Sequence, residues 1–146
     1  MGFKKRLEEL SSYCRDKGIP LTQQRLAIFQ ELSASNDHPS PEEIHIRLRR
    51  SFPTLSLATV YNNLEALSKI GFIRKINPLS DHVRYDYELH EHGHFICLSC
   101  KMIEDVDHPV IRELEIPIPE PFDHIITSKA IQYYGICKLC RDDTDS

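Results

Sequence analysis

Two pairs of cysteines constrain the fold of this chain more than any other feature of its sequence. Cys97-Leu-Ser-Cys100 and Cys137-Lys-Leu-Cys140 are both C-x-x-C pairs, and 36 residues lie between them. Four thiolates with this spacing predict a closed, tetrahedral zinc site with a structural role. Two unrelated thiol pairs, or a redox-active pair, are the alternatives. The spacer is longer than in a simple zinc ribbon, so we expect folded structure between the pairs.

Histidines gather directly before the first cysteine pair. His92 and His94 are two residues apart, so in a β-strand both imidazoles point to the same face. Two imidazoles on one face are half of a site for a first-row metal, although an isolated histidine is more often an ordinary surface or core residue. Oxygen ligands can come from Asp86, and the spacing does not choose among three further carboxylates: Glu91, Glu104 and Asp105.

The first half of the chain has the periodicity of a helical domain. The pattern predicts helices over residues 3–17, 22–35, 40 to about 51, and 57 to about 69. Ser40, Pro41 and Glu43 are typical of a helix start with a capping box. Cys14 falls on the apolar stripe of the first helix, and we expect it in the core.

The fourth predicted helix has a face suited to reading DNA. Its apolar stripe consists of Leu57, Val60, Leu64 and Leu67, and its other face carries Ala58, Thr59, Tyr61, Asn62 and Asn63. Two helices joined by a tight turn, the second with such a face, are typical of a helix-turn-helix. A hairpin predicted over residues 72–87, with its turn at 77–82, would complete a winged helix. The alternative is an ordinary helical bundle with a solvated polar face.

The net charge of −4 argues at first against a nucleic-acid partner. The charge is unevenly distributed, however. Through Glu88 there are 13 Lys and Arg against 11 Asp and Glu, and thereafter 5 against 11. The first half is therefore a mildly basic head, with a net charge of +2, which includes Lys4, Lys5, Arg6, Arg15, Arg25, Arg74, Lys75 and Arg84. The acidic excess lies in the second half of the chain, so it no longer argues against a nucleic-acid partner.

Several classes of protein fit the sequence poorly. No apolar run approaches the roughly 20 residues of a membrane span, and the charged start lacks the apolar region of a secretory signal, so a cytoplasmic protein is expected. The chain has no H-E-x-x-H pattern, Gly-rich phosphate loop or nucleophile elbow, so we do not expect an enzyme. A hydrolytic or dioxygen-using metalloenzyme and a zinc-stabilised interaction module without DNA binding are the competing interpretations.

The order and spacing of these segments resemble those of the ferric uptake regulator family of metal-dependent bacterial repressors. The resemblance rests on Leu21-Thr-Gln-Gln-Arg25, His38-Pro39, residues 57–64, residues 92–100 and Tyr134-Gly-Ile-Cys-Lys-Leu-Cys140. It implies an α+β chain, with a winged helix-turn-helix DNA-binding domain over residues 1–86 and a hinge at its end. An α+β dimerisation and metal-sensing domain would follow over residues 87–146. The protein would bind double-stranded operator DNA as a homodimer.

The resemblance also implies the site residues. Structural Zn²⁺ would be bound by Cys97, Cys100, Cys137 and Cys140. Regulatory Fe²⁺ or Mn²⁺ would be bound by His38, Asp86, His92, His94 and Asp105. DNA would be contacted by Arg25, Ala58, Thr59, Tyr61, Asn62 and Asn63.

Smaller features are similar to the peroxide-responsive (PerR) branch of the family. Carboxylates at Asp86 and Asp105, and Asn62, resemble that branch. The implied mechanism is metal-catalysed oxidation of a ligand imidazole, at His38 or His92, which releases the metal and then the DNA. An iron- or zinc-responsive uptake regulator of the same family is the alternative.

The sequence also departs from the family pattern. Glu91, Gly93 and Lys129 stand where members with an accessory metal site have ligands, so that site is not expected. Lys101 follows the first cysteine pair, where Gly is usual. A dimerisation helix that starts near Pro109 cannot extend past about Ile116, because prolines follow at 117, 119 and 121.

Overall fold

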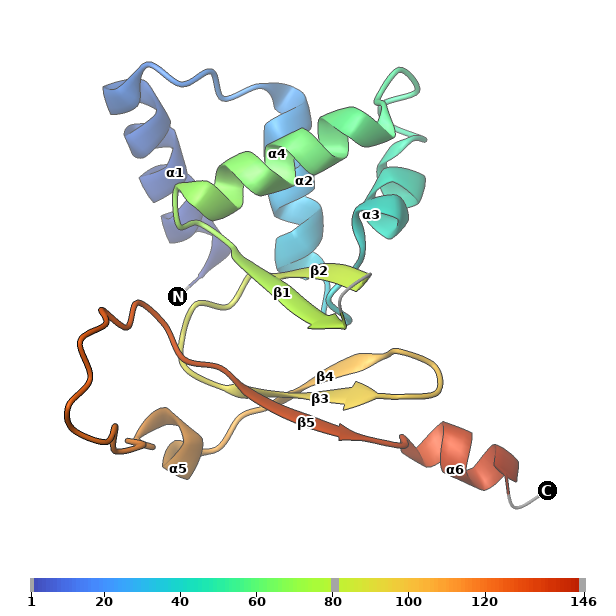
Figure 1. Cartoon of the computed structure of the whole chain (residues 1–146). Helices are drawn as coiled ribbons and strands as arrows, with labels where there is room; N and C mark the ends of the chain where they lie inside the picture. Colours follow the sequence, from blue (N-terminus) through green and yellow to red (C-terminus); the bar gives the residue numbers. More distant parts are fainter. Residues whose placement is uncertain (1, 80–81, 145–146) are drawn as a thin grey trace. The chain divides into compact units, whose positions relative to one another are not determined.

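Two compact units divide the chain, Met1–Leu89 and His90–Ser146. The computed structural model describes residues 2–79 and 82–144 (Figure 1). Within these residues the first unit consists of helices and a β-hairpin, and the second of a small sheet with two short helices. The α+β fold class expected from the sequence is confirmed.

Four helices build most of the first unit: α1 (Phe3–Lys17), α2 (Gln23–Ala34), α3 (Pro41–Leu48) and α4 (Leu57–Lys69). Thr22, Ser40 and Ser56 cap the last three, because each side chain accepts a hydrogen bond from the backbone N–H three residues later. At α3 the expected capping box is complete, since the Glu43 carboxylate also accepts from the backbone N–H of Ser40. The helix ends at Leu48, a few residues earlier than predicted.

The core of the first unit lies between these helices. The buried residues are Leu10 and Cys14 of α1, Ile28, Phe29 and Leu32 of α2, Ile44 and Leu48 of α3, and Val60, Leu64 and Leu67 of α4, joined by Leu55, Ile73, Tyr85 and Tyr87. Cys14 is 1% exposed, as expected for a core residue. Leu57 was predicted to lie on the buried stripe of α4, but it is only half-buried.

A β-hairpin follows α4 and forms the wing. Strands β1 (Arg74–Leu79) and β2 (His82–Asp86) pair antiparallel, with Arg74 opposite Asp86. The predicted hairpin is confirmed, although the strands extend into the segment 77–82 that was expected to turn, and residues 80–81 lie outside the described residues. The pair α3–α4 with this hairpin makes a winged helix-turn-helix.

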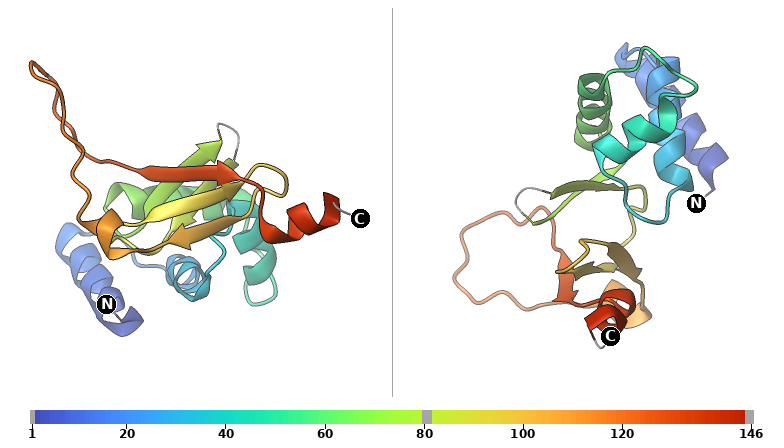
Figure 2. Two further views of the ribbon diagram at one scale, coloured as in Figure 1. Left: turned by 90° about the horizontal axis from the view of Figure 1, so that it is seen from below. Right: turned by 90° about the vertical axis from the view of Figure 1, so that its right-hand side faces the viewer.

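The second unit is built on a three-stranded sheet with the order β4-β3-β5. Strand β3 (Gly93–Cys97) pairs antiparallel with β4 (Ile103–Val106) and parallel with β5 (Ile131–Gly135). The parallel pair requires a long crossover, which contains β4, helix α5 (Pro109–Arg112) and a loop that extends away from the sheet (Figure 2). Helix α6 (Lys138–Thr144) follows β5.

Helix α5 is even shorter than the sequence predicted. It ends at Arg112, and residues 113–130 form neither helix nor strand. Pro117, Pro119 and Pro121 have no backbone N–H to donate to a helix or a sheet, so they keep this segment irregular.

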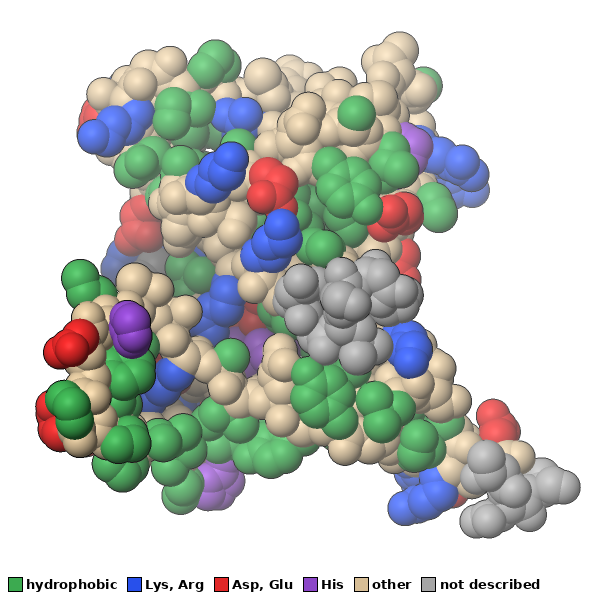
Figure 3. Space-filling view, in the orientation of Figure 1, with side chains coloured by type: hydrophobic (Ala, Val, Ile, Leu, Met, Phe, Trp, Pro, Cys, Tyr) green, Lys and Arg blue, Asp and Glu red, His purple; other side chains and the backbone are tan. Residues whose placement is uncertain are grey.

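Much of the hydrophobic surface of the second unit is exposed. Figure 3 shows hydrophobic side chains gathered on its viewed face. The exposed large side chains are Leu98, Val110, Leu114, Ile116, Ile118, Phe122, Ile125, Ile126, Tyr133, Tyr134, Ile136 and Leu139. An apolar surface of this extent is typical of an interaction surface. Among the described residues, no helix combines the length and hydrophobicity that crossing a membrane requires.

Candidate metal sites and DNA-binding face

The four predicted zinc ligands lie together at one end of the sheet of the second unit. The Sγ atoms of Cys97, Cys100, Cys137 and Cys140 all lie within 4.8 Å of one another. Cys97 is the last residue of β3 and Cys137 comes two residues after the end of β5, so the parallel pairing of these strands brings the two C-x-x-C pairs together across the long crossover. Every one of the four cysteines is free of a disulfide.

Backbone amides stabilise a thiolate in this cluster. The N–H of Cys137 donates to the Cys97 Sγ over 3.4 Å, and with the amides of Cys100 and Ser99 it lowers the pKa of Cys97 to about 6. At Cys140 the Ser99 hydroxyl favours the thiolate, but the thiols of Cys137 and Cys100 outweigh it and raise the pKa to about 11. Neighbouring sulfurs thus oppose a second negative charge, which a bound Zn²⁺ would neutralise. The donor set fits zinc.

Lys101 follows the first cysteine pair with a backbone φ of +66°. This left-handed conformation is the reason that glycine suits the position. The Lys101 N–H donates to the carbonyl oxygen of Cys97 over 3.0 Å and its ammonium donates to the carbonyl of Leu98. The turn therefore forms with a lysine in a conformation that costs free energy.

A second set of ligands lies on the same unit, before and within β3. The Nε2 atoms of His92 and His94 lie 3.2 Å and 3.5 Å from the same oxygen, Oδ1 of Asp105 on β4. The cross-strand pairing of His94 with Asp105 places the carboxylate there. Glu104 is paired opposite Phe95 instead, so the register of β3 and β4 identifies Asp105 among the acidic residues that spacing left open.

The hydrogen bonding of His92 suits a metal ligand. Its Nδ1 lies 2.8 Å from the carbonyl oxygen of His90, and because a carbonyl only accepts, Nδ1 carries the proton. In the neutral ring Nε2 is then a lone-pair donor. This nitrogen and the Asp105 carboxylate both offer electron pairs to the same point, an arrangement that a cation stabilises. The donors present fit a hard or borderline metal such as Fe²⁺ or Mn²⁺.

The first unit has an imidazole and a carboxylate that lie close to each other. Nε2 of His38 lies 3.7 Å from Oδ1 of Asp86, and both side chains are almost completely buried. Asp86 ends β2, and its Oδ1 accepts from the backbone N–H of Glu88 over 2.8 Å. His38 lies in the loop before α3 with a φ of +48°. A non-glycine residue keeps such a conformation only where its surroundings hold it.

The expected DNA contacts divide into exposed and buried residues. Ala58 and Asn62 are exposed on α4, and Thr59 and Tyr61 are half-buried. Asn63 was expected on the same exposed face, but that placement is wrong, because it is 7% exposed and belongs to the buried side of α4. Its Oδ1 accepts from Nε of Arg25 over 2.7 Å, while its Nδ2 donates to the carbonyl of Thr59.

Two arginines of the predicted basic head are not available as free surface charges. Arg6 is 6% exposed, and it donates to the backbone carbonyls of Tyr87 and Phe72 beneath the Tyr87 ring. Arg84 donates to the Glu43 carboxylate over 2.7 Å. The first unit therefore offers less positive charge to a ligand than its residue count suggests, because these two guanidinium groups are engaged within the protein.

Sequence reasoning missed the long-range contacts of two acidic residues at the start of α3. The hydroxyl of Tyr61 donates to Oε1 of Glu42 over 2.6 Å, and this bond lowers the pKa of the Glu42 carboxyl. Glu43 was recognised as a capping residue but not as the partner of Arg84. The periodicity of α3 and α4 gives no signal for either contact, because both depend on how the two helices and the wing pack.

The sequence of the chain is similar to those of known proteins. The sequence model of the ferric uptake regulator family matches residues 16–134. The peroxide-responsive repressor PerR of Staphylococcus aureus strain Mu50 is 37% identical over 136 residues, covering 93% of this chain and 92% of that protein. These matches cover both units.

Solved structures extend the similarity to the fold. The Helicobacter pylori ferric uptake regulator, described with three functional metal binding sites, matches with a TM-score of 0.77 and 26% identity over 97% of this chain and 95% of that one. PerR from Streptococcus pyogenes matches at 32% identity over 91% of each chain, with a TM-score of 0.52. The chain therefore belongs to the ferric uptake regulator family, whose members are metal-responsive transcriptional regulators.

Proposed function

We propose that this chain is a metal-dependent, peroxide-sensing repressor that binds operator DNA as a homodimer. The observation that carries the proposal is the chemistry of the His/Asp ligands. His92, His94 and Asp105 converge in the second unit, while His38 and Asp86 adjoin in the first. The set offers only nitrogen and oxygen, and both carboxylates are aspartates, as in the peroxide-responsive branch. The similarity to PerR proteins supports the same assignment.

The two metals would have separate roles. Zn²⁺ on Cys97, Cys100, Cys137 and Cys140 would be structural, because four thiolates leave no open coordination position. The regulatory Fe²⁺ or Mn²⁺ would be bound by His38, Asp86, His92, His94 and Asp105. Since these five residues come from both units, binding would favour one placement of the DNA-binding units and so link metal affinity to DNA affinity.

The sensing reaction needs an oxidisable ligand beside a redox-active metal. Bound Fe²⁺ would supply the one-electron chemistry that activates hydrogen peroxide, and Mn²⁺ would not. The net reaction inserts one oxygen atom of hydrogen peroxide into an imidazole, at His38 or His92, and releases the other as water. The oxidised imidazole would be a poorer ligand, so the chain would lose affinity for the metal and with it the arrangement that binds DNA.

The apolar surface of the second unit supports the homodimer. Its exposed residues on α5, the loop 113–130 and β5 would be covered by a second copy of the chain. With a charge of only +2 on each N-terminal half, two joined units would bind DNA far better than one.

Peroxide treatment of the Fe²⁺-loaded chain tests the proposal. A duplex selected by the Mn²⁺-loaded protein from a random-sequence pool serves as the DNA probe. We expect mass spectrometry to find one added oxygen on His38 or His92, with loss of binding to that duplex, while the Mn²⁺-loaded chain stays unmodified. An unmodified Fe²⁺-loaded chain that keeps its DNA would instead support an iron- or zinc-responsive uptake regulator.

A further inference from the structure

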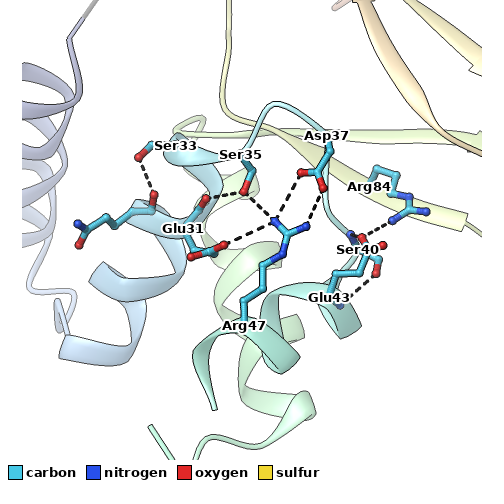
Figure 4. A network of polar contacts seen from close by, with 9 residues as sticks. Glu31, Ser33, Ser35, Asp37, Ser40, Glu43, Arg47 and Arg84 are labelled. Carbon is cyan, nitrogen blue, oxygen red and sulfur yellow. Dashed lines mark hydrogen bonds and ion pairs between the residues drawn. The ribbon is translucent and has the colours of Figure 1, made fainter. Parts of the chain in front are cut away.

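Side chains of α3 bind the loop that precedes this helix at two points, with Arg47 contacting Asp37 and Glu43 contacting Ser40 (Figure 4). The loop from Ser35 to Ser40 joins α2 to α3 and carries His38 in its left-handed conformation. Because the intrinsic preference of a histidine opposes this conformation, contacts on either side of it must hold the loop. The structure shows which side chains do so.

Arg47 of α3 binds the residues of the loop that precede His38. Its guanidinium donates to Oδ2 of Asp37 over 2.6 Å and to Oγ of Ser35 over 3.1 Å, and it lies 3.5 Å from Oε1 of Glu31 on α2. Ser35 is fixed in turn, because its hydroxyl donates to the carbonyl of Glu31 over 2.7 Å. The planar fork of an arginine can satisfy several acceptors at once, which a lysine cannot do.

The capping box of α3 binds the end of the loop that follows His38. Glu43 accepts from the backbone N–H of Ser40 over 2.7 Å. The same carboxylate oxygen accepts from Arg84 on β2 over 2.7 Å, two residues before Asp86. One turn of α3 therefore fixes both the loop of His38 and the strand of Asp86.

We propose that Arg47 is a positioning residue for the regulatory metal, because it holds the 35–40 loop so that the His38 imidazole stays beside Asp86. The inference rests on the proposed ligand role of His38. Arg47 itself is not a ligand, because a protonated guanidinium offers no electron pair to a metal, and its side chain is 34% exposed. Exposed ion pairs contribute little to global stability, so its removal should loosen the loop without unfolding the unit.

The variant Arg47→Met tests this in the full-length, zinc-loaded chain. Mn²⁺ titration should show an affinity about 10-fold lower, the usual scale for losing a group that orients a ligand. Arg47→Lys should recover part of the loss, since it keeps the charge but not the fork. With Co²⁺ as the probe, the visible absorption of Arg47→Met should shift, because the position of one imidazole changes.

Two controls separate positioning from general destabilisation. Arg50→Met removes an equal charge just beyond α3, at a side chain for which no hydrogen bond or ion pair is recorded within the described residues, and Mn²⁺ affinity should not change. The melting temperature and zinc content of Arg47→Met should match the parent. At saturating Mn²⁺, Arg47→Met should bind the selected duplex as the parent does.

The outcomes distinguish this inference from the proposed function. If His38→Ala binds Mn²⁺ as tightly as the parent, the proposed ligand set is wrong and the role of Arg47 falls with it. If His38→Ala loses Mn²⁺ but Arg47→Met and Arg50→Met both bind like the parent, only the positioning role is wrong. Equal losses in Arg47→Met and Arg50→Met would show a charge effect and would also overturn it.

Discussion

Arg25 donates from its Nε to Oδ1 of Asn63 over 2.7 Å, and this bond joins α2 to α4. The Arg25 Nη1 donates to the carbonyl of Pro20 over 2.8 Å, so two of its nitrogens are held within the protein. Asn63 is held by its own bond to the carbonyl of Thr59. The guanidinium of Arg25, one of the expected DNA contacts, is thereby held in one position.

Replacing Asn63 should therefore affect folding and DNA binding together. Asn63→Ala removes the acceptor of a partly buried arginine nitrogen, so we expect the free energy of unfolding to fall by about 1 kcal/mol. The affinity of the folded protein for the selected duplex should fall about 10-fold, because a misaligned Arg25 loses about 1.4 kcal/mol of contact energy. Thermal melting and fluorescence anisotropy measure the two effects.

Asn62→Ala is the matched comparison, because Asn62 lies next in the chain and is exposed. This variant should bind the duplex more weakly with an unchanged melting temperature. An Asn63→Ala protein that binds the duplex like the parent would contradict the role of Asn63 in aligning Arg25.

The zinc site should be essential to the second unit. Cys97→Ser removes a proposed ligand that is buried at the end of β3. Because a structural zinc contributes its binding energy directly to folding, we expect loss of zinc, loss of cooperative melting of this unit and loss of the dimer. Metal analysis and analytical ultracentrifugation measure these outcomes. A dimeric, folded Cys97→Ser chain would disprove the zinc assignment.

The zinc affinity should depend on pH with a break near pH 6. Zinc binds thiolates, and the Cys137 amide lowers the pKa of Cys97 from 9.0 to about 6. The free-energy contribution of this thiolate to the folded chain is therefore present at high pH and disappears as the pH falls through about 6. Above that pH zinc displaces protons only from the remaining thiols, whereas below it zinc also competes with a proton on Cys97.

Competition with a chelator at a series of pH values measures this dependence. The slope of the logarithm of zinc affinity against pH should steepen by about one proton below pH 6. A slope that stays constant from pH 5 to pH 8 would show that Cys97 is not ionised ahead of the other cysteines.

Two residues with the same backbone angle offer a direct measure of strain. Lys101 and Gly18 both have a φ of +66°. Lys101→Gly should raise the free energy of unfolding by about 1 kcal/mol, since glycine adopts this conformation without steric cost. Gly18→Ala should lower it by a similar amount, because no atom lies within 4 Å of the new Cβ and only the backbone is strained.

Denaturant unfolding of the zinc-loaded chains measures both changes. Zinc content should stay the same in Lys101→Gly, which separates backbone strain from altered metal binding. If both substitutions shift stability in the same direction, backbone strain does not explain the rarity of a lysine at this position.

Local chemistry made much of the fold predictable. The caps at Thr22, Ser40 and Ser56 depend on residues within one turn of each helix, so the sequence indicates them directly. The cysteine cluster was predictable for a different reason, because zinc chemistry demands four ligands wherever the chain places them. The spacing of two predicted that His92 and His94 share a face, and both imidazoles indeed approach the same carboxylate oxygen.

Contacts between elements were not predictable in this way. Asn63 looks like a surface residue in a periodic pattern, yet its polar groups are satisfied inside by Arg25 and Thr59. Arg6 carries a charge and is nevertheless buried, since backbone carbonyls and the Tyr87 ring receive its guanidinium. The choice of Asp105 over Glu104 needed the register of β3 and β4, which no local pattern reveals.

The first unit should fold by itself but bind DNA weakly. Residues 1–89 contain their own buried core, so we expect cooperative thermal melting of this fragment. Its net charge is close to neutral, and Arg6 and Arg84 are engaged within the protein, so a single unit has few cations for phosphates. Joining two units in a dimer should raise affinity by about 100-fold or more without any new contact to DNA.

Fluorescence anisotropy with the selected duplex compares the fragment with the Mn²⁺-loaded full-length chain. Equal affinities would mean that neither dimerisation nor the metal controls DNA binding, and would contradict the proposed regulation at its central step.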